Sequence, residues 1–516
     1  MTPRRHRLSR RSFLGTTFIG LLPKTDPPIT GSFVFESQNW GHRLRDRAAF
    51  PSPAETVNKA VIIVGGGIAG LSAAWRMEKR GFRDFLLLEA ETQAGGNSRW
   101  GENEITAYPW AAHYLPVPNR QAALVRELCE ELGLLHDGQW DERHLCHSLQ
   151  ERLFLHGRWQ EQLEPSIGLT AEDHRQFQQF DQRMAEFRAS GRFTIPMELG
   201  RDRLDSLDSR SWDRISMQDW MKQERFASSY LNWYVNYACR DDYGALAADT
   251  SAWAGIHYFA SREHEDKGPL VWPEGNGWIV RRLLAKLDRY VRTGDPVQRI
   301  EPVGTVGRKF RVTTGRTAYL ADVVIFAAPT FLAPYLVDGA PRVNFTYSPW
   351  LTANLTLERL PEQRGAEIAW DNVIYESPAL GYVVATHQSL RRHIPRTVWT
   401  YYWALAQGSP QQNRALLLAR DWNAWKEAIL NDLSRAHPDI RRCVSRVDIL
   451  RLGHAMVRPV PGLLASEERR RLAAGSGRIL YANSDLSGLS IFEEAQYRGV
   501  KAADRALQIV GGLKVG

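Results

Sequence analysis

The stretch VIIVGGGIAGLSAAWRMEKRGFRDFLLLE, residues 61–89, contains an apolar run, a glycine-rich turn, a helical segment and a second apolar run, in that order. This order predicts a complete βαβ unit that binds a dinucleotide. Gly65 permits the tight turn, Gly67 lets the backbone approach a pyrophosphate, and Gly70 lets the helix pack closely on the strand. Glu89 ends the second strand, where a carboxylate accepts hydrogen bonds from ribose hydroxyls. Because the strand, the helix and the acidic residue all agree with the glycine spacing, we expect a nucleotide site rather than an ordinary turn.

A second glycine-rich turn follows in ETQAGGNSR, residues 91–99, which contains Gly95, Gly96 and Arg99. A soluble NAD-dependent dehydrogenase has no need of this glycine pair, so the expected ligand is FAD. The sequence here resembles the flavin-containing amine oxidase superfamily, which includes monoamine and polyamine oxidases, protoporphyrinogen oxidase and the carotenoid desaturases. The resemblance implies that Gly95, Gly96 and Arg99 take part in binding FAD.

Other segments in the middle of the chain are similar to the same superfamily. WPEGNGW, residues 272–278, looks like the turn that leads into the second helix of the flavin domain. Residues 296–300, 310–314 and 321–329 look like the strands that follow. In that family the backbone at the position of Val297 touches adenine.

The C-terminal segments RILYANSD, residues 478–485, and SIFEEA, residues 490–495, are similar to the closing strand, turn and helix of the family. By this resemblance Asp485 holds the ribityl chain. Backbone N–H groups near Phe492 would face the flavin pyrimidine ring from a helix N-terminus, which favours negative charge on the reduced ring. Monoamine oxidases bind flavin covalently through a cysteine shortly before this helix. No cysteine lies between Asp485 and Phe492, so FAD is expected to bind without a covalent bond.

The order of these motifs predicts an α/β fold with a Rossmann-type FAD-binding domain, built on a parallel sheet, and an interleaved α+β substrate domain. The FAD-binding domain is expected to be discontinuous and to comprise residues 56–118, 270–338 and 445–512. The substrate domain is expected to comprise residues 119–269 and 339–444. Residues 1–55 are expected to form an export signal and a linker.

The N-terminal segment SRRSFL, residues 9–14, is followed by a short apolar run and resembles a twin-arginine export signal. This pathway moves folded proteins, which suits an enzyme whose dinucleotide is inserted in the cytoplasm. The run is too short for a standard membrane-spanning helix, which needs about 20 apolar residues. We therefore expect a periplasmic protein that engages the twin-arginine export machinery. Cleavage of the signal and peripheral contact with a membrane stay open, and the alternative is a disordered basic tail.

Composition and charge exclude several classes of protein. The chain is 43% hydrophobic and 24% charged, which is typical of a globular protein with a large core. Five arginines within the first eleven residues account for most of the formal net charge of +8. The remainder is nearly balanced, and no basic stripe interleaved with aromatics predicts nucleic-acid binding. The four cysteines form no C-x-x-C pair, so no metal site is expected. The expected partner is a small-molecule substrate, and the oligomeric state stays open.

Few residues in the sequence indicate the chemistry, because the flavin carries it. The family often places a lysine near the flavin N5 atom, and the matching position here is Arg342, a candidate catalytic residue in that role, although an arginine cannot act as a base at neutral pH. The alternative is a surface arginine after a loop. His113, in the segment that passes close to the flavin ring in the family, is a candidate acid or base, and Trp110 a candidate wall residue. Amine oxidases flank the flavin with two aromatic rings, and one of these positions is occupied here by Ile491. This difference weakens an assignment to amines.

Two further clusters interleave polar and aromatic residues, CRDDY at 239–243 and WAGIHYF at 253–259. Asp241 and Asp242 suit the binding of a cationic amine, but a charged turn between two helices is the simpler interpretation, since adjacent residues rarely face the same way. Whether Asp241, Asp242 and His257 line a pocket stays open.

Three hypotheses about function follow from the sequence. The first is an exported FAD-dependent oxidoreductase that transfers hydride from an amine-like small molecule to flavin N5, with reoxidation by oxygen or another acceptor. The second is a flavoenzyme of the same fold that desaturates a larger apolar or cyclic substrate. The third is a binding protein in which FAD is structural and no reaction occurs.

Overall fold

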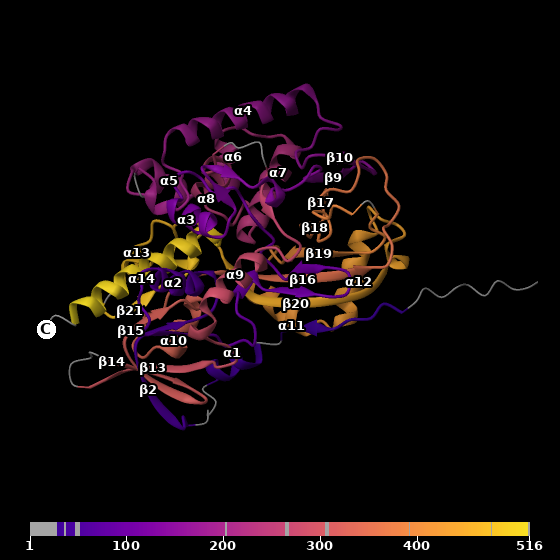
Figure 1. The fold of residues 1–516 in the computed structure, drawn as a ribbon. Helices are drawn as coiled ribbons and strands as arrows, with labels where there is room; N and C mark the ends of the chain where they lie inside the picture. The colour runs from indigo at the N-terminus through magenta and orange to yellow at the C-terminus, as the bar shows by residue number, and fades with distance from the viewer. Residues whose placement is uncertain are drawn as a thin grey trace, which may run out of the picture.

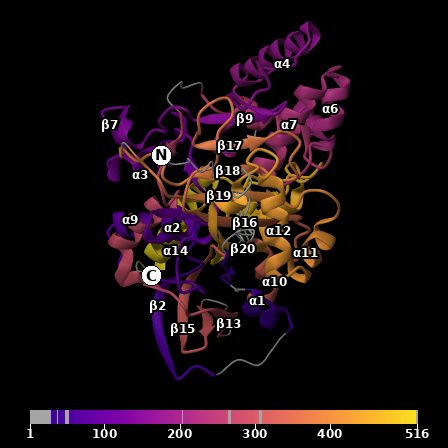
Figure 2. The same cartoon turned by 90° about the vertical axis from the view of Figure 1, so that its right-hand side faces the viewer.

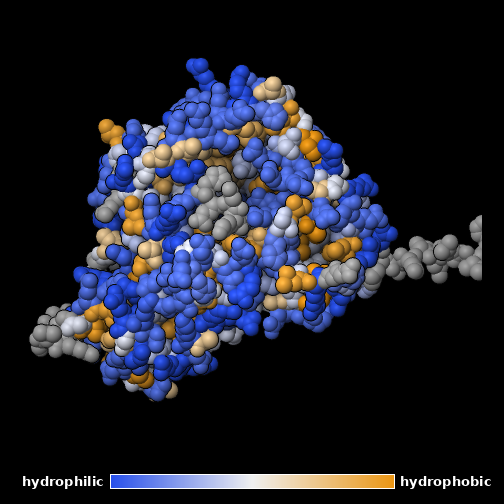
Figure 3. All heavy atoms as spheres, turned by 45° about the horizontal axis from the view of Figure 1, so that its top comes forward, coloured by the Kyte–Doolittle hydropathy of each residue, from blue (hydrophilic) through white to orange (hydrophobic). Residues whose placement is uncertain are grey.

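The computed structural model describes residues 28–35, 38–46, 52–201, 204–263, 268–304, 309–391, 393–475 and 477–513. These residues form two large sheets with helices packed around them (Figure 1). The predicted twin-arginine segment, residues 9–14, lies outside them. None of the helices described is long and apolar enough to cross a membrane. The face drawn in Figure 3 is mostly hydrophilic, with apolar side chains in small separate groups.

The first sheet contains the predicted βαβ unit. Its strands run in the order β12, β3, β2, β15, β14, β13, and β21 pairs with β15 beyond the end of β14. The pairs among β12, β3, β2, β15 and β21 are parallel, whereas β13 and β14 form an antiparallel extension. The strands are β2 (Glu55–Val64), β3 (Phe85–Leu88), β12 (Val291–Arg292), β13 (Val297–Val303), β14 (Lys309–Thr314), β15 (Thr317–Phe326) and β21 (Ile479–Tyr481).

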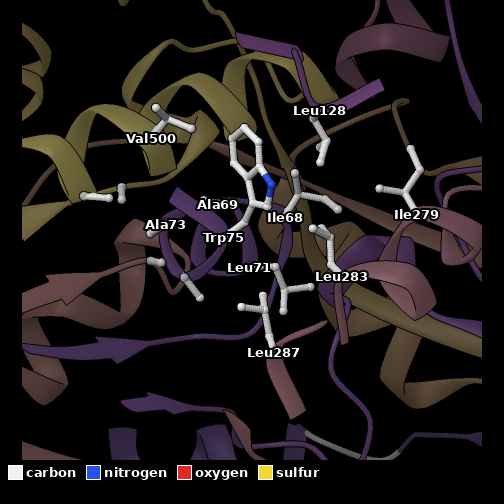
Figure 4. Close-up of a cluster of buried hydrophobic side chains, with 14 of the residues drawn as sticks. Ile68, Ala69, Leu71, Ala73, Trp75, Leu128, Ile279, Leu283, Leu287 and Val500 are labelled. Carbon is white, nitrogen blue, oxygen red and sulfur yellow. The ribbon is translucent and has the colours of Figure 1, made fainter. Parts of the chain in front are cut away.

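Three helices from distant parts of the chain cover this sheet: α2 (Ile68–Lys79), α9 (Gly277–Leu287) and α14 (Phe492–Leu513). Apolar residues of α2 at helical spacing, among them Leu71 and Trp75, pack between α9 and α14 (Figure 4). Gly499 lets α14 approach α2 closely, because a Cβ atom at this position would lie 2.1 Å from the carbonyl oxygen of Ala69. The short α10 (Ala333–Leu336) and α1 (Gln38–Arg45) lie against each other.

The second sheet has eight strands in the order β1, β20, β16, β19, β18, β17, β9, β10. It is antiparallel except for the pairs β1–β20 and β17–β9. Trp399 and Tyr401 are fully buried in its core. The strands are β1 (Phe33–Val34), β9 (Glu151–Leu155), β10 (Arg158–Glu161), β16 (Tyr347–Leu357), β17 (Asp371–Ile374), β18 (Gly381–Val384), β19 (Thr397–Ala404) and β20 (Val444–Val457).

A cluster of helices stands beside this second sheet, and both ribbon views place its members together (Figures 1 and 2). It comprises α4 (Ala171–Ala189), α5 (Leu207–Arg214), α6 (Met217–Gln223), α7 (Ser229–Tyr243) and α8 (Ala252–Ala260). The remaining helices are α3 (Ala123–Glu131), α11 (Pro410–Ala419), α12 (Trp422–Leu433) and α13 (Glu467–Ala474). Six short strands complete the description: β4 (Trp100–Glu102), β5 (Ala107–Pro109), β6 (Tyr114–Leu115), β7 (Leu135–His136), β8 (Gln139–Trp140) and β11 (Leu270–Val271).

Two predicted domain boundaries differ from the structure. The prediction places residues from 445 onward in the FAD-binding domain. However, β20 pairs along most of its length with β16 and therefore belongs to the second sheet, which we call the substrate sheet. The prediction also places residues 1–55 in a signal and linker, but β1 is a strand of the same sheet and α1 packs on the flavin domain. Both errors arise because pairing between distant strands leaves no local mark in the sequence.

Candidate active site

A cavity of about 850 Å³ is lined by residues of both sheets. Its flavin-domain wall contains the turn between β2 and α2, the second glycine-rich turn and the start of α14. Its opposite wall contains residues of α7, β16, β17, β19 and β20. Nine of the ten residues predicted to bind FAD line this cavity: Gly65, Gly67, Glu89, Gly95, Gly96, Arg99, Val297, Asp485 and Phe492.

The three glycines of the first turn have different surroundings. Gly65 has φ +106°, and a Cβ atom there would lie 2.8 Å from the backbone nitrogen of Ala328. Gly70 lies behind the turn, where a Cβ atom would come within 1.9 Å of the carbonyl oxygen of Gly65. At Gly67 the nearest atom to such a Cβ is the Cα of Gly96, 4.0 Å away. A Cβ atom at Gly67 would therefore meet no atom closer than ordinary van der Waals contact, and this glycine faces the cavity, as the approach of a pyrophosphate requires.

Glu89 follows the last residue of β3 and is partly buried at the edge of the cavity. Its carboxylate accepts hydrogen bonds from the backbone N–H groups of Gly66, at 2.6 Å, and of Glu91, at 2.8 Å. Burial raises the pKa of Glu89, while these two N–H groups act in the opposite direction. The carboxylate therefore holds the first turn in place, a role that the sequence analysis did not predict, in addition to facing the cavity.

The second turn lies directly against the first. The N–H of Gly95 donates to the carbonyl of Gly66 at 2.8 Å, and the Nε of Arg99 donates to the carbonyl of Gly96 at 3.0 Å. Arg99 is 5% exposed, and its Nη1 atom has no hydrogen-bond partner; the carboxylate of Glu91 lies 3.9 Å away. Burial lowers the pKa of Arg99. A buried guanidinium with an unsatisfied donor is suited to an anionic ligand.

The closing segments complete the cofactor wall. Asp485 accepts hydrogen bonds from the N–H of Thr330, at 2.9 Å, and from the hydroxyl of Tyr347, at 2.8 Å, and burial raises its pKa. Phe492 begins α14, so that the free N–H groups of that helix start at the cavity. The side-chain oxygen of Asn276 is a further buried polar atom without a partner in the described part of the chain. Because an unsatisfied buried polar group costs about 1–3 kcal/mol, these groups fit a polar dinucleotide such as FAD.

Comparison with known proteins identifies the family. The profile of the flavin containing amine oxidoreductases matches residues 68–507. The chain belongs to this family. It is therefore an FAD-dependent oxidoreductase, and the third hypothesis, that of a binding protein without a reaction, is not supported.

Solved structures of similar fold cover nearly the whole of this flavin amine oxidoreductase. A putrescine oxidase bound to putrescine has a TM-score of 0.64 at 15% identity, over 88% of this chain and 100% of the other. Cyclohexylamine oxidase from Brevibacterium oxydans IH-35A has a TM-score of 0.65 at 16% identity, over 88% and 99%. A protein described as a protoporphyrinogen oxidase, from Exiguobacterium sp. 255-15, has a TM-score of 0.60 at 16% identity, over 87% and 99%. At these identities the likeness shows the fold alone.

A curated relative matches over a short stretch. The Baeyer-Villiger monooxygenase peniC from Penicillium patulum is 41% identical over 61 residues. The match spans 12% of this chain and 9% of that protein.

His113, one of the two predicted catalytic residues, lies in the cavity wall. Its imidazole is 4.5 Å from the ring of Tyr402, centroid to centroid, and its Nδ1 atom is 3.3 Å from the carbonyl oxygen of Ala111. Burial lowers the pKa of His113 to about 4. The ring is therefore neutral at pH 7 and is not a source of protons there. Trp110 is buried behind this wall and packs edge-on against Tyr108 and Phe35.

Arg342, the other predicted catalytic residue, is exposed and is not among the residues that line the cavity. The prediction that Arg342 stands near the flavin N5 atom is therefore corrected: the segment between α10 and β16 runs over the surface at this point. Ile491 lines the cavity, as the family position requires.

Asp241 and Asp242 lie in the last turn of α7, and both line the cavity. The simpler interpretation, a charged turn between two helices, is wrong, because both residues belong to helix α7 itself. Burial raises the pKa of Asp241 to about 7 and the pKa of Asp242 to about 6. His257 does not line the cavity; its Nε2 atom is 2.9 Å from the carbonyl oxygen of Thr194, and burial lowers its pKa to about 4.

Asp371, which sequence reasoning missed, is a third carboxyl group in the same wall. It begins β17, where it is paired in register with Glu151 of β9. Burial and then the nearby carboxylates of Glu151 and Asp241 raise the pKa of Asp371 well above its usual value. In the sequence, Asp371 is only an acidic residue at the start of an apolar strand, about 130 positions from Asp241. Nothing in that pattern indicates that the two carboxyl groups lie close together.

The cavity is also lined by five arginines: Arg45, Arg99, Arg262, Arg414 and Arg451. Arg262 lines the cavity, but its guanidinium is paired with the carboxylate of Glu493 at 2.9 Å. In the described part of the chain, no lysine or arginine forms an ion pair with Asp241 or Asp371. Asp241 and Asp371 therefore lie in a local group of buried carboxyl groups that raise one another's pKa, and a cationic ligand would stabilise their charged forms.

Proposed function

We propose that this flavin amine oxidoreductase oxidises a small amine that carries positive charge into the cavity. The observation that supports the proposal is the group of three carboxyl residues, Asp241, Asp242 and Asp371, in the wall of the cavity that the FAD-binding turns border. Of the five arginines that line the cavity, Arg262 is paired with Glu493, and in the described part of the chain no arginine forms an ion pair with Asp241 or Asp371. A desaturase of an apolar substrate has no use for buried carboxylates, because each is costly to ionise without a counter-charge.

The side chains of the wall would bind and orient this amine. Aromatic rings of Tyr114, Tyr402 and Trp350 line the cavity together with the carboxyl groups, and their faces attract an ammonium group. The hydroxyl of Tyr402 donates to the carbonyl of Ala111 at 2.9 Å, which fixes its ring. Bound flavin supplies the hydride acceptor, and the substrate loses hydride from the carbon next to nitrogen and a proton from nitrogen. Water then converts the imine into an aldehyde and ammonium.

Product analysis distinguishes this proposal from the second hypothesis. With a panel of amines and of cyclic apolar compounds, we expect one aldehyde and one ammonium to form for each amine consumed, with hydrogen peroxide where oxygen is the acceptor. A new carbon–carbon double bond without release of ammonium would instead establish a desaturase.

We further propose that FAD is bound without a covalent bond. All four cysteines are buried, and none of them lines the cavity. Acid precipitation of the purified protein should leave the yellow colour in the supernatant, because loss of the fold releases a ligand held by non-covalent contacts. Colour in the pellet would show a covalent flavin.

We also propose that the protein is exported to the periplasm by the twin-arginine pathway. The double substitution Arg10→Lys and Arg11→Lys keeps the charge but removes both guanidinium groups, which only a receptor that reads them would detect. Cell fractionation should find this variant folded and FAD-loaded in the cytoplasm. Equal amounts of variant and parent in the periplasm would identify the segment as a basic tail or another signal.

A further inference from the structure

The chain segment that precedes the first flavin strand, residues 28–35 and 38–46, contributes residues of α1 to the lining of the cavity; we call it the N-terminal strap. It precedes the residues that the family profile matches, which begin at 68. It starts on the substrate sheet as β1 and ends on the flavin domain as α1. The described parts of the strap therefore contact both domains: β1 pairs with the second sheet, and α1 packs on the flavin domain.

The first half of the strap is fixed to β20 by backbone hydrogen bonds. The N–H of Thr30 donates to the carbonyl of Ser445 at 3.0 Å, and the N–H of Val447 donates to the carbonyl of Thr30 at 2.8 Å. At Gly31, where φ is +140°, a Cβ atom would lie 1.8 Å from the carbonyl oxygen of Val447. A side chain there would push the strap off the sheet.

Two aromatic rings of the strap contact arginines of the cavity wall. The guanidinium carbon of Arg99 lies 4.5 Å from the ring centroid of Phe35, and that of Arg451 lies 3.7 Å from the ring centroid of Phe33. Both arginines line the cavity. The ring of Phe35 also packs edge-on against Trp110 at 5.6 Å, and this contact fixes its position. A ring face held against a guanidinium limits the orientations of that group and attracts its charge.

The second half of the strap adds residues to the cavity wall itself. Trp40, His42 and Arg45 of α1 line the cavity beside the FAD-binding turns. Leu44 is 5% exposed and anchors α1 in the core of the flavin domain.

We propose that the N-terminal strap is an FAD-binding element of this protein in addition to the family segments. Phe35 is a positioning residue whose ring holds the guanidinium of Arg99. The Nη1 atom of Arg99, which has no hydrogen-bond partner within the protein, would donate to the FAD pyrophosphate. Phe33 holds Arg451 in the same way, and α1 covers the edge of the site. This inference depends on FAD binding alone and is independent of which substrate is oxidised.

A double-mutant cycle on the full chain tests the proposal. FAD is removed, and the dissociation constant for added FAD is measured by quenching of flavin fluorescence for the parent, Phe35→Leu, Arg99→Met and the double variant. Because a partly buried cation–π contact contributes on the order of a tenfold change, Phe35→Leu should raise the dissociation constant about tenfold. In the Arg99→Met background the same change should have an effect of less than about twofold, because the cation that Phe35 positions is absent.

Two controls make the result decisive. Phe82→Leu removes a partly buried ring that does not line the cavity and should leave FAD affinity unchanged. Phe35→Tyr keeps the ring face and should restore the parent affinity, also where Phe35→Leu does not fold. An unchanged dissociation constant in Phe35→Leu, an equal effect in both Arg99 backgrounds, or a failure of Phe35→Tyr to restore binding would each overturn the proposal. Retained amine oxidation in any of these variants has no bearing on it.

Discussion

The variant Gly67→Val is expected to purify folded but colourless. Gly67 has a φ of −74°, a value that all L-amino acids adopt. Valine at this position therefore does not have to take up a left-handed backbone conformation. The nearest atom to its Cβ would be the Cα of Gly96, 4.0 Å away, and because Gly67 lines the cavity, the branched side chain would occupy cavity space beside the two glycine-rich turns. Because the pyrophosphate would have to occupy this space, FAD affinity should fall by at least about a hundredfold.

The measurement is the ratio of flavin absorbance to protein absorbance after purification, with circular dichroism of the apoprotein as the test of folding. Gly511→Val is the matched control, because a Cβ atom at Gly511 meets no other atom within 4 Å, and this variant should keep its flavin. Gly70→Ala is a less specific test, since its Cβ would lie 1.9 Å from the carbonyl of Gly65 and would disrupt the turn itself. A yellow Gly67→Val protein with normal flavin content would refute the assignment of this turn.

Glu89→Ala should impair FAD retention less than Gly67→Val does, but should also destabilise the fold. The substitution leaves the N–H groups of Gly66 and Glu91 without their acceptor, and an unsatisfied buried donor costs about 1–3 kcal/mol. Thermal unfolding of the apoprotein separates this loss from the loss of ribose contacts, because the parent apoprotein makes no such contacts. Normal flavin content in both Glu89→Ala and Gly67→Val would contradict the account of the cofactor site.

The double variant Asp241→Asn and Asp371→Asn is expected to lose most of its kcat/KM for a diamine. Removal of buried partners from a cation costs about 2–5 kcal/mol, so we expect a loss of at least about thirtyfold. The effect should be mainly on KM, because these carboxyl groups bind the substrate. Asp208→Asn, on the exposed start of α5, is a control that should have no effect. Unchanged kinetics in the double variant would remove the support for a cationic substrate.

Affinity for a cation should increase as the pH rises through the pKa of Asp241, which is about 7. Below this pH the carboxyl is protonated and neutral, so binding of a bis-quaternary ammonium inhibitor should strengthen as the pH rises through about 7. Such an inhibitor does not titrate, so the change reports on the protein. In Asp241→Asn this step should be smaller.

The same pKa predicts an effect on stability. Because the pKa of Asp241 is higher in the folded protein than in the unfolded chain, the free energy of unfolding falls as the pH rises from about 4 through 7. Asp241→Asn should therefore raise Tm at pH 8 and change it little at pH 4. A lower Tm at pH 8 would show that the carboxylate is not an unfavourable buried charge.

Local signals allowed the cofactor site to be predicted from the sequence. The turns around Gly65 and Gly95 depend on glycine at fixed spacing, and their strands and helix on apolar periodicity, so all the information lies within about forty residues. The substrate wall has no such signal. Asp241, at the end of a helix, and Asp371, at the start of a strand, are brought together only by the pairing of β17 within the second sheet. Arg342 was assigned by position in a loop, which does not determine where a side chain points.

The N-terminal strap was missed for the same physical reason. Phe33 and Phe35 lie in what reads as a linker, and their contacts with Arg451 and Arg99 depend on the parallel pairing of two-residue β1 with β20. A two-residue strand is too short for a periodic pattern.

Anaerobic reduction of the bound flavin tests the central claim most directly, because it needs neither the natural acceptor nor knowledge of the product. The purified, FAD-loaded protein is mixed without oxygen with an α,ω-diamine, with the monoamine of equal length, and with the corresponding diol. We expect the diamine to bleach the yellow absorbance, the monoamine to do so more weakly, and the diol to leave it unchanged. If no amine of the panel bleaches the flavin while dithionite does, or if the diol reduces it as well as the diamine, the protein is not an amine oxidase that selects its substrate by charge.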